Sequence, residues 1–151
     1  MISAQRRAHF ANPQNPFWRL LHESGLVPLR LEPGQQRRLL DFGIGITNLA
    51  ARATASAAEL EADDFERGRR VLMKKIRRYR PRAVAFVGVS AYREFARSRA
   101  PLRCGEQQEP LCGARLFVLP NPSGRNAHYR YSDMLRLFRL MARSLDRGAR
   151  R

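Results

Sequence analysis

The chain has 151 residues, of which 44% are hydrophobic, and this size suits one domain, residues 1–151, with a substantial core. Its 29 Lys and Arg residues exceed its 13 Asp and Glu residues, so the formal net charge is +16, and the expected partner is a polyanion, DNA or RNA before an anionic membrane. No stretch approaches the roughly 20 continuous apolar residues of a membrane span. Residues 1–10 lack the apolar segment of a signal peptide. We therefore expect a cytoplasmic protein, nucleoid-associated if it is bacterial.

Three helices are predicted in the first half of the chain. Asn15–Ser24 carries Pro16 at an early position and its apolar residues on one side, which is typical of a short helix. A second helix is expected from Pro33 to about Asp41. The segment 42–50 mixes β-branched residues with two glycines, which favours a buried turn or a short strand. Residues 63–79 form the clearest helix, because apolar residues recur there at helical spacing among many Lys and Arg residues.

Two strands and two helices are predicted in the second half. Ala83–Val87 and Ala114–Val118 are short apolar runs of strand length. Ser90–Arg97 reads as a helix capped by Ser90, and Ser132–Leu145 has apolar residues on one side and arginines on the other. A basic tail, 147–151, follows. Strands without alternation, separated by helices, indicate an α/β fold with a parallel sheet covered on both faces.

Polar loops follow both predicted strands. The octet LPNPSGRN, Leu119–Asn126, comes directly after the second strand, and Gly88 follows the first. Open parallel sheets bind ligands at the carboxyl ends of their strands. These loops are therefore expected to carry the functional site.

The residue pattern gives little support to metal binding, serine hydrolysis or a nucleotide-binding phosphate loop. Cys104 and Cys112 cannot by themselves form a four-cysteine metal site; reduced thiols are favoured over a redox pair or a shared metal. The three histidines are scattered, Ser90 and Ser123 lack the setting of a nucleophile elbow, and no K-[ST] follows the glycines at 43 and 45.

Four segments together resemble the mismatch-specific uracil/thymine-DNA glycosylase family, in the same order and at similar intervals. They are His9–Gly25, Leu39–Thr54, Phe65–Gly88 and Leu116–Asn126, and they cover nearly the whole chain. The resemblance implies a three-layer α/β/α sandwich with a short parallel sheet. It further implies a monomeric base-excision-repair enzyme that needs no metal or cofactor. Such an enzyme hydrolyses the N-glycosidic bond of uracil or mispaired thymine flipped out of double-stranded DNA.

The resemblance assigns roles to residues in three places. Phe10 matches the aromatic that stacks on the flipped base, although composition alone favours a core position for it. Thr47 and Asn48 match the pocket segment, where an Asn amide reads the edge of uracil; a turn-capping Asn is the alternative. Asn121, Ser123 and Gly124 match the second motif, which supports the minor-groove insertion loop, and Arg125 and Asn126 stand where the family presents a wedge.

The family's first motif, resembling G-I-N-P-G, is not found in this sequence. It supplies the Asn that positions the attacking water, and Met1–Ala4 resembles the segment directly after it. We therefore expect the first strand and the catalytic Asn to lie upstream of Met1, and we assign no catalytic residue; Asp41 and Asn48 are the nearest replacements by family position. The alternatives are a misplaced start of a true glycosylase, a DNA-binding relative with little excision, and a basic RNA-binding protein.

Overall fold

The computed structural model describes residues 15–49, 62–122 and 129–149. In chain order the elements are α2 (Phe17–Glu23), the 3₁₀ helix η1 (Pro33–Phe42), α3 (Ala62–Tyr79), β1 (Ala83–Val87), α4 (Val89–Ala96), β2 (Gly105–Glu106), β3 (Arg115–Leu119) and α5 (Tyr131–Ala149). Every helix and strand expected within these ranges is present, although the second helix is of the 3₁₀ type with a kink at Gln35. The predicted α/β fold class is confirmed.

The sheet has the strand order β1-β3-β2. The two expected strands pair in parallel, with Ala83 opposite Arg115 and Val87 opposite Leu119. Strand β2 was not predicted; it pairs antiparallel to β3 and makes the sheet mixed. Arg115 holds this edge, because its guanidinium donates to both carboxylate oxygens of Glu106 at 2.7 and 2.8 Å. These hydrogen bonds lower the pKa of Glu106.

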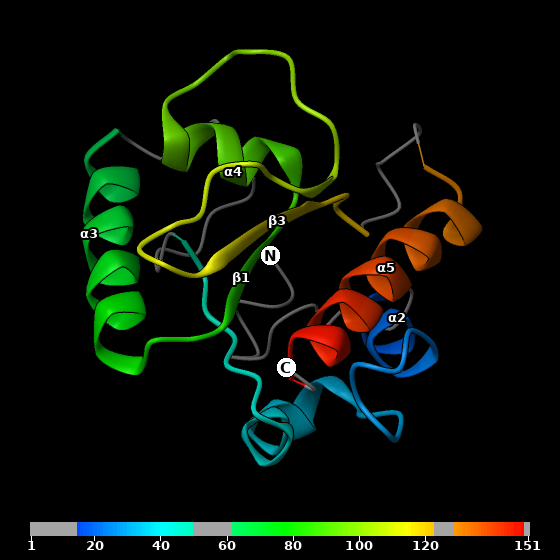
Figure 1. Ribbon diagram of the computed structural model, residues 1–151. Helices are drawn as coiled ribbons and strands as arrows, with labels where there is room; N and C mark the ends of the chain where they lie inside the picture. Colours follow the sequence, from blue (N-terminus) through cyan, green and yellow to red (C-terminus); the bar gives the residue numbers. More distant parts are fainter. Residues whose placement is uncertain (1–14, 50–61, 123–128, 150–151) are drawn as a thin grey trace.

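Helices cover both faces of the sheet (Figure 1). The side chains of β3 alternate between the two faces. Leu116 packs with Phe86 and Phe95 in a small cluster on the side of α3 and α4. Phe117 and Leu119 point to the opposite face, into the larger core formed with α2 and α5. Two apolar layers on one sheet explain why the strands lack the alternation of a half-exposed strand.

Helix starts differ from the prediction at two places. Gly88, not Ser90, is the N-cap residue of α4, and Ser90 lies exposed in its first turn. The prediction of a Ser90 cap was therefore wrong. At α2, Pro16 takes the N-cap position, and Asn15 Oδ1 accepts a hydrogen bond from the amide of Phe17 at 3.0 Å.

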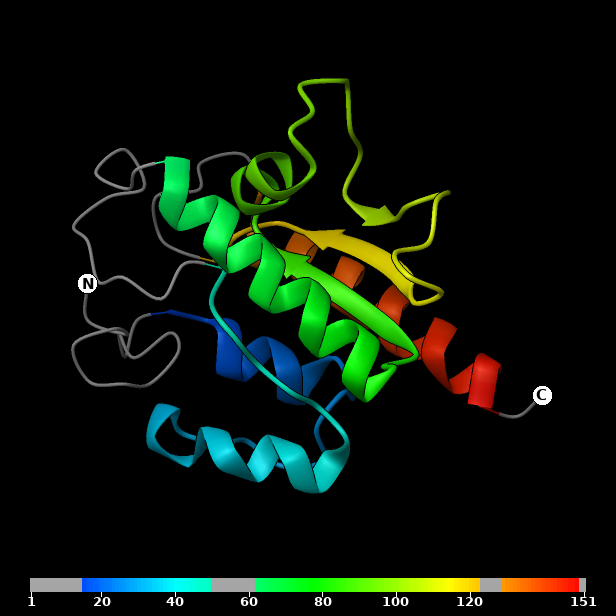
Figure 2. The ribbon, with the colours of Figure 1, turned by 90° about the vertical axis from the view of Figure 1, so that its left-hand side faces the viewer.

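The segment 43–49, expected to be a buried turn or a short strand, is neither fully buried nor paired with a strand of the described part. Ile44 and Ile46 are half-buried against the larger core, whereas Leu49 packs against the small cluster. The segment leaves η1 and runs along β1 toward the edge where that strand ends (Figure 2). It thus carries its last residues to the carboxyl edge of the sheet.

Tyr131 joins α5 to α2. Its hydroxyl donates a hydrogen bond to the Glu23 carboxylate, and the Arg19 guanidinium lies 4.2 Å from the centre of its ring. Partial burial and this hydrogen bond raise the pKa of Tyr131 to about 12, and the same bond lowers the pKa of Glu23.

We expect the protein to lose stability as the pH rises from about 10 to 12. The unfolded tyrosine ionises near pH 10, whereas Tyr131 in the folded protein holds its proton until about pH 12, so alkali favours the unfolded chain. Tyr131→Phe should reduce this pH dependence in urea unfolding measured from pH 8 to 12. Tyr79→Phe, a change at a side chain that is 67% exposed, is the matched control. An identical pH dependence in Tyr131→Phe and the wild type would contradict the assignment.

Candidate functional site

The carboxyl ends of β1 and β3 meet at one edge of the sheet. The parallel register places Val87 opposite Leu119, and the Gly88 amide donates to the Leu119 carbonyl oxygen at 2.8 Å. The predicted adjacency of the loops after the two strands is confirmed. Polar groups presented by either loop are therefore close together in space.

Gly88 has a backbone conformation that other residues rarely adopt, with φ at +129°. The Asn121 side chain lies over it: a Cβ atom added at Gly88 would be 3.6 Å from Asn121 Cβ and 3.8 Å from its Nδ2. The glycine thus permits a turn directly after β1 and a close approach of the Asn121 amide to the backbone. This contact places a predicted site residue over the end of β1.

The loop after β3 is anchored at both of its described ends. Pro120 and Pro122 are fully buried, while Asn121 between them is exposed. Where the chain returns, the Tyr129 hydroxyl donates to Cys104 Sγ at 3.3 Å, and this bond together with burial raises the pKa of Tyr129. Two prolines with fixed φ and a tied return point limit the conformations of the loop ends.

Thr47 and Asn48 are both exposed near the end of the segment that runs along β1. Lys75 of α3 donates from Nζ to Thr47 Oγ1 at 3.0 Å. A hydroxyl that accepts one bond keeps its own proton for a ligand. Lys75 therefore holds the orientation of Thr47 without using its donor, and Asn48 follows it at the same edge.

The segment that ends with Thr47 and Asn48 runs to the edge of the sheet where β1 ends (Figure 2), and the Asn121 side chain lies over Gly88 at that end of β1. Asp41, considered as a replacement for the missing Asn, is exposed on η1, at the end of the segment 43–49 remote from this edge (Figure 2). Phe10 and the residues Ser123, Gly124, Arg125 and Asn126 lie outside the described residues. The predictions made for those five residues stay predictions.

Two residues near the site were missed by sequence reasoning. Lys75 looked like one more cation of a basic helix, and Cys104 like a loop thiol; both cysteines are free, Cys104 half-buried and Cys112 exposed. The partners of Lys75 and Cys104 lie 28 and 25 residues away in the chain. No local pattern marks such pairs.

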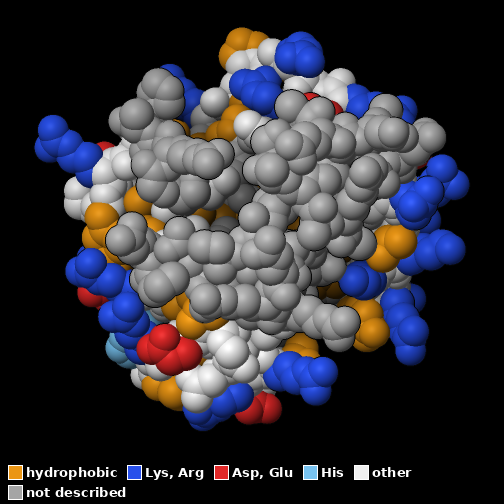
Figure 3. Space-filling view, turned by 180° about the vertical axis from the view of Figure 1, so that it is seen from behind, with side chains coloured by type: hydrophobic (Ala, Val, Ile, Leu, Met, Phe, Trp, Pro, Cys, Tyr) orange, Lys and Arg blue, Asp and Glu red, His pale blue; other side chains and the backbone are white. Residues whose placement is uncertain are grey.

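The face that contains the carboxyl edge is bordered by cations. Figure 3 looks onto this face, and Lys and Arg side chains lie around its margin, with few acidic side chains among them. Within the ranges that the structure describes, no three His, Cys, Asp or Glu side chains gather as metal ligands would. None of the helices in the described part has the length and apolar character that crossing a membrane requires.

The model of the uracil DNA glycosylase superfamily matches residues 1–143. The chain belongs to this superfamily. Uracil DNA glycosylases act on DNA, so DNA is the polyanionic partner that the match supports for this chain.

In this glycosylase the base-binding residues implied by the resemblance come from separate parts of the chain. The match spans the segment at Thr47, the end of β1 at Gly88 and the loop at Asn121. The fold supplies the common edge, because parallel strands deliver their carboxyl ends to one side. Its helices supply the positive border.

Proposed function

We propose that this protein is a mismatch-specific uracil/thymine-DNA glycosylase that hydrolyses the N-glycosidic bond of a uracil or mispaired thymine flipped out of duplex DNA. The observation that carries the proposal is the meeting of the 47–48 segment with the Gly88 and Asn121 turns at one edge, within a superfamily match that covers residues 1–143. Each of these segments also resembles the mismatch-specific family.

The exposed amide of Asn48 suits recognition of the base. An amide offers one acceptor and two donors, which complements the alternating carbonyl and N–H groups of uracil. As the glycosidic bond breaks, the base leaves with a negative charge on its oxygens. Preorganised donors at this charge stabilise the transition state, and Thr47, held by Lys75, is a second donor at the same edge.

The loop after β3 is proposed to support insertion into the minor groove. The buried Pro120 and Pro122 keep its base rigid, so less conformational entropy is lost on binding. In this proposal Ser123 and Gly124 continue the motif, and Arg125 with Asn126 fills the gap that the flipped nucleotide leaves and contacts phosphate. Phe10 stacks on the base.

The residue that positions the attacking water stays unassigned. The sequence contains no G-I-N-P-G segment, and Asp41 lies remote from the carboxyl edge. Asn48 is at this edge, but its proposed role is recognition of the base. The chain's own contribution is thus to bind, orient and stabilise the leaving base.

An excision assay tests the proposal. Duplexes of about 30 base pairs with a single G·U, G·T or G·C pair are incubated with this chain and with a form extended by any upstream in-frame codons for G-I-N-P-G. We expect the extended form to produce abasic sites in the G·U and G·T duplexes and none in the G·C duplex. Cleavage of the abasic strand by alkali is the readout.

Each other result has a meaning. Excision by the chain without the extension would show that a residue of this chain positions the attacking water. Excision of uracil but not of thymine would contradict the mismatch-specific assignment and leave the superfamily function intact. If neither form excises a base, and RNA binds more tightly than uracil-containing DNA, the glycosylase proposal is wrong.

A further inference from the structure

The outer face of α3 is unusually basic. Of the 16 residues 67–82, nine are Lys or Arg and none is acidic. Four of these cations recur at helical spacing on one face and are exposed, and we call them the α3 stripe: Arg67, Arg70, Lys74 and Arg78. They surround the exposed Val71 and, at the rise of an α-helix, extend over about 16 Å.

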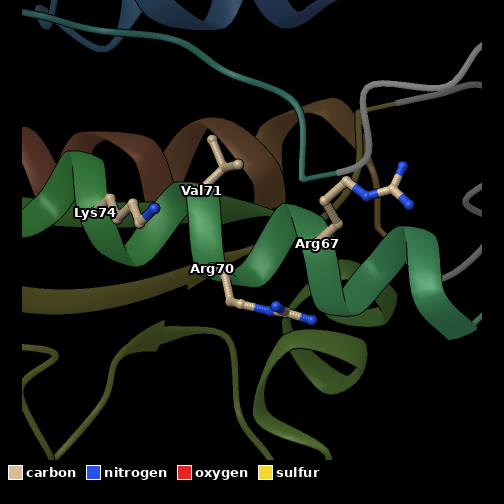
Figure 4. A pocket seen from close by; sticks show the side chains of 4 residues that line it. All are labelled: Arg67, Arg70, Val71 and Lys74. Carbon is tan, nitrogen blue, oxygen red and sulfur yellow. The ribbon is translucent and has the colours of Figure 1, made fainter.

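The α3 stripe faces away from the core. Leu72 and Met73 pack inward against the small cluster, whereas a hollow of about 470 Å³ on the other side is lined by Arg67, Arg70, Val71 and Lys74. Figure 4 shows Lys74 toward one end of this stretch of α3 and Arg67 toward the other, with Val71 and Arg70 between them on opposite sides of the helix. The hollow therefore presents three cations and no carboxylate.

Little in the described part of the chain neutralises these charges. Arg70 reaches Glu66 only at 3.9 Å, and among the carboxylates whose side chains the structure describes, which start at Glu66 in this helix, none pairs with Arg67, Lys74 or Arg78. Cations three and four residues apart on a helix repel each other. The cations of the α3 stripe therefore repel each other along the outer face of the helix. A row of bound phosphates would neutralise their charges and remove this repulsion.

The direction of α3 separates this face from the base-binding edge. The helix ends at Tyr79, just before the amino end of β1, so it runs antiparallel to that strand (Figure 2). The α3 stripe consequently starts near the carboxyl edge and leads away from it down the flank of the molecule. Duplex DNA is stiff over tens of base pairs. A duplex lying across the edge would have to bend sharply to continue along α3, whereas a separate segment would not.

We propose that the α3 stripe binds the phosphate backbone of a second DNA segment while the carboxyl edge holds the first. The occupant is duplex DNA, because its regular rows of phosphates complement the four cations and because the superfamily acts on DNA. This inference rests on the proposed function only for the position of the first duplex. Such a surface lets the enzyme move between DNA segments without leaving DNA.

A charge-matched pair of variants tests the inference. The α3 variant carries Arg67→Gln, Arg70→Gln, Lys74→Gln and Arg78→Gln. The control carries Arg136→Gln, Arg139→Gln, Arg143→Gln and Arg147→Gln on α5, which has the same residue spacing and the same loss of charge, with all four side chains exposed. Glutamine retains helix propensity, and removing repulsion should leave the melting temperature of the α3 variant unchanged or raised.

The readout is bridging of two duplexes. A donor-labelled G·U duplex and an acceptor-labelled undamaged duplex are mixed with protein, and energy transfer is measured from 50 to 200 mM salt, with protein mass checked to exclude a dimer as the bridge. We expect wild type and control to bridge. The α3 variant should bind the second duplex at least tenfold more weakly, with a salt slope lower by about 3.6, since each of the four phosphate contacts contributes about 0.9.

Other results overturn the inference. One is that the α3 variant and the α5 control bridge equally well, or lose bridging equally. The other is that double-stranded RNA or phosphatidylserine vesicles displace the acceptor duplex at a lower phosphate concentration than DNA does. Uracil excision is followed in parallel. Bridging without excision would contradict the proposed function alone, and excision without α3-dependent bridging would contradict this inference alone. If the fourfold variant does not fold, the pairs Arg67→Gln/Arg70→Gln and Lys74→Gln/Arg78→Gln replace it.

Discussion

Replacing Asn48 with alanine is expected to lower kcat for uracil excision by about 10²-fold in the active form of the enzyme. The amide is exposed at the carboxyl edge and is proposed to hydrogen-bond the leaving base. Loss of one preorganised donor to a developing negative charge commonly costs 10²–10³ in kcat. Single-turnover excision from a G·U duplex measures the effect directly.

The substitution should not alter the fold. Because Asn48 is exposed, the melting temperature of the Asn48→Ala variant should match that of the wild type. Gln108→Ala is a suitable control, since Gln108 is an exposed amide in the loop after β2, directed toward the amino end of β3. Wild-type turnover by Asn48→Ala would remove Asn48 from the base-binding site and favour the turn-capping role.

Truncation of Phe138 to alanine is expected to lower the free energy of unfolding by about 3–5 kcal/mol. The ring is 1% exposed in the centre of α5 and belongs to the cluster that joins α2, α5 and the sheet. Removing the Phe138 ring leaves a cavity, because the residues around it belong to α2, α5 and the sheet and cannot all move in to fill it. Because small proteins have total stabilities of roughly 5–15 kcal/mol, a large part of the stability should be lost. Urea unfolding monitored by circular dichroism measures the change.

Leu140→Ala provides the comparison on the same helix. Its side chain is 50% exposed, so truncation should change the unfolding free energy by no more than about 0.5 kcal/mol. Equal effects of the two substitutions would show that α5 is not packed through Phe138. Such a result would also contradict the two-layer core described above.

Helical spacing explains why the helices were predictable. In α5 the buried residues Met134, Leu137, Phe138 and Met141 recur every three or four positions, and the same spacing in α3 buries Ile76. These patterns are local, since one face of a helix must leave water. Strand β2 was missed because it has only two residues, and its pairing depends on Val118 and Phe117, which lie 13 and 11 positions further along the chain.

The resemblance named Asn48, in the segment after η1, and Asn121, in the loop after β3, and the roles assigned to them stay predictions. The contacts that support the carboxyl edge were not predicted from the sequence. The Lys75–Thr47 and Tyr129–Cys104 hydrogen bonds join separate elements, and the N-cap of α4 moved to Gly88 because the turn after β1 needs a positive φ beside Asn121.

By itself the amino-acid sequence determined the class of elements, their order, the positive charge and the relation to DNA glycosylases, because composition, periodicity and motif order are properties of the chain. Only the tertiary structure decided which polar residues share an edge and which cations form one exposed face. Those relations depend on strand register and helix direction. Both are set by packing between residues far apart in the chain, as in the pairing of Val87 with Leu119.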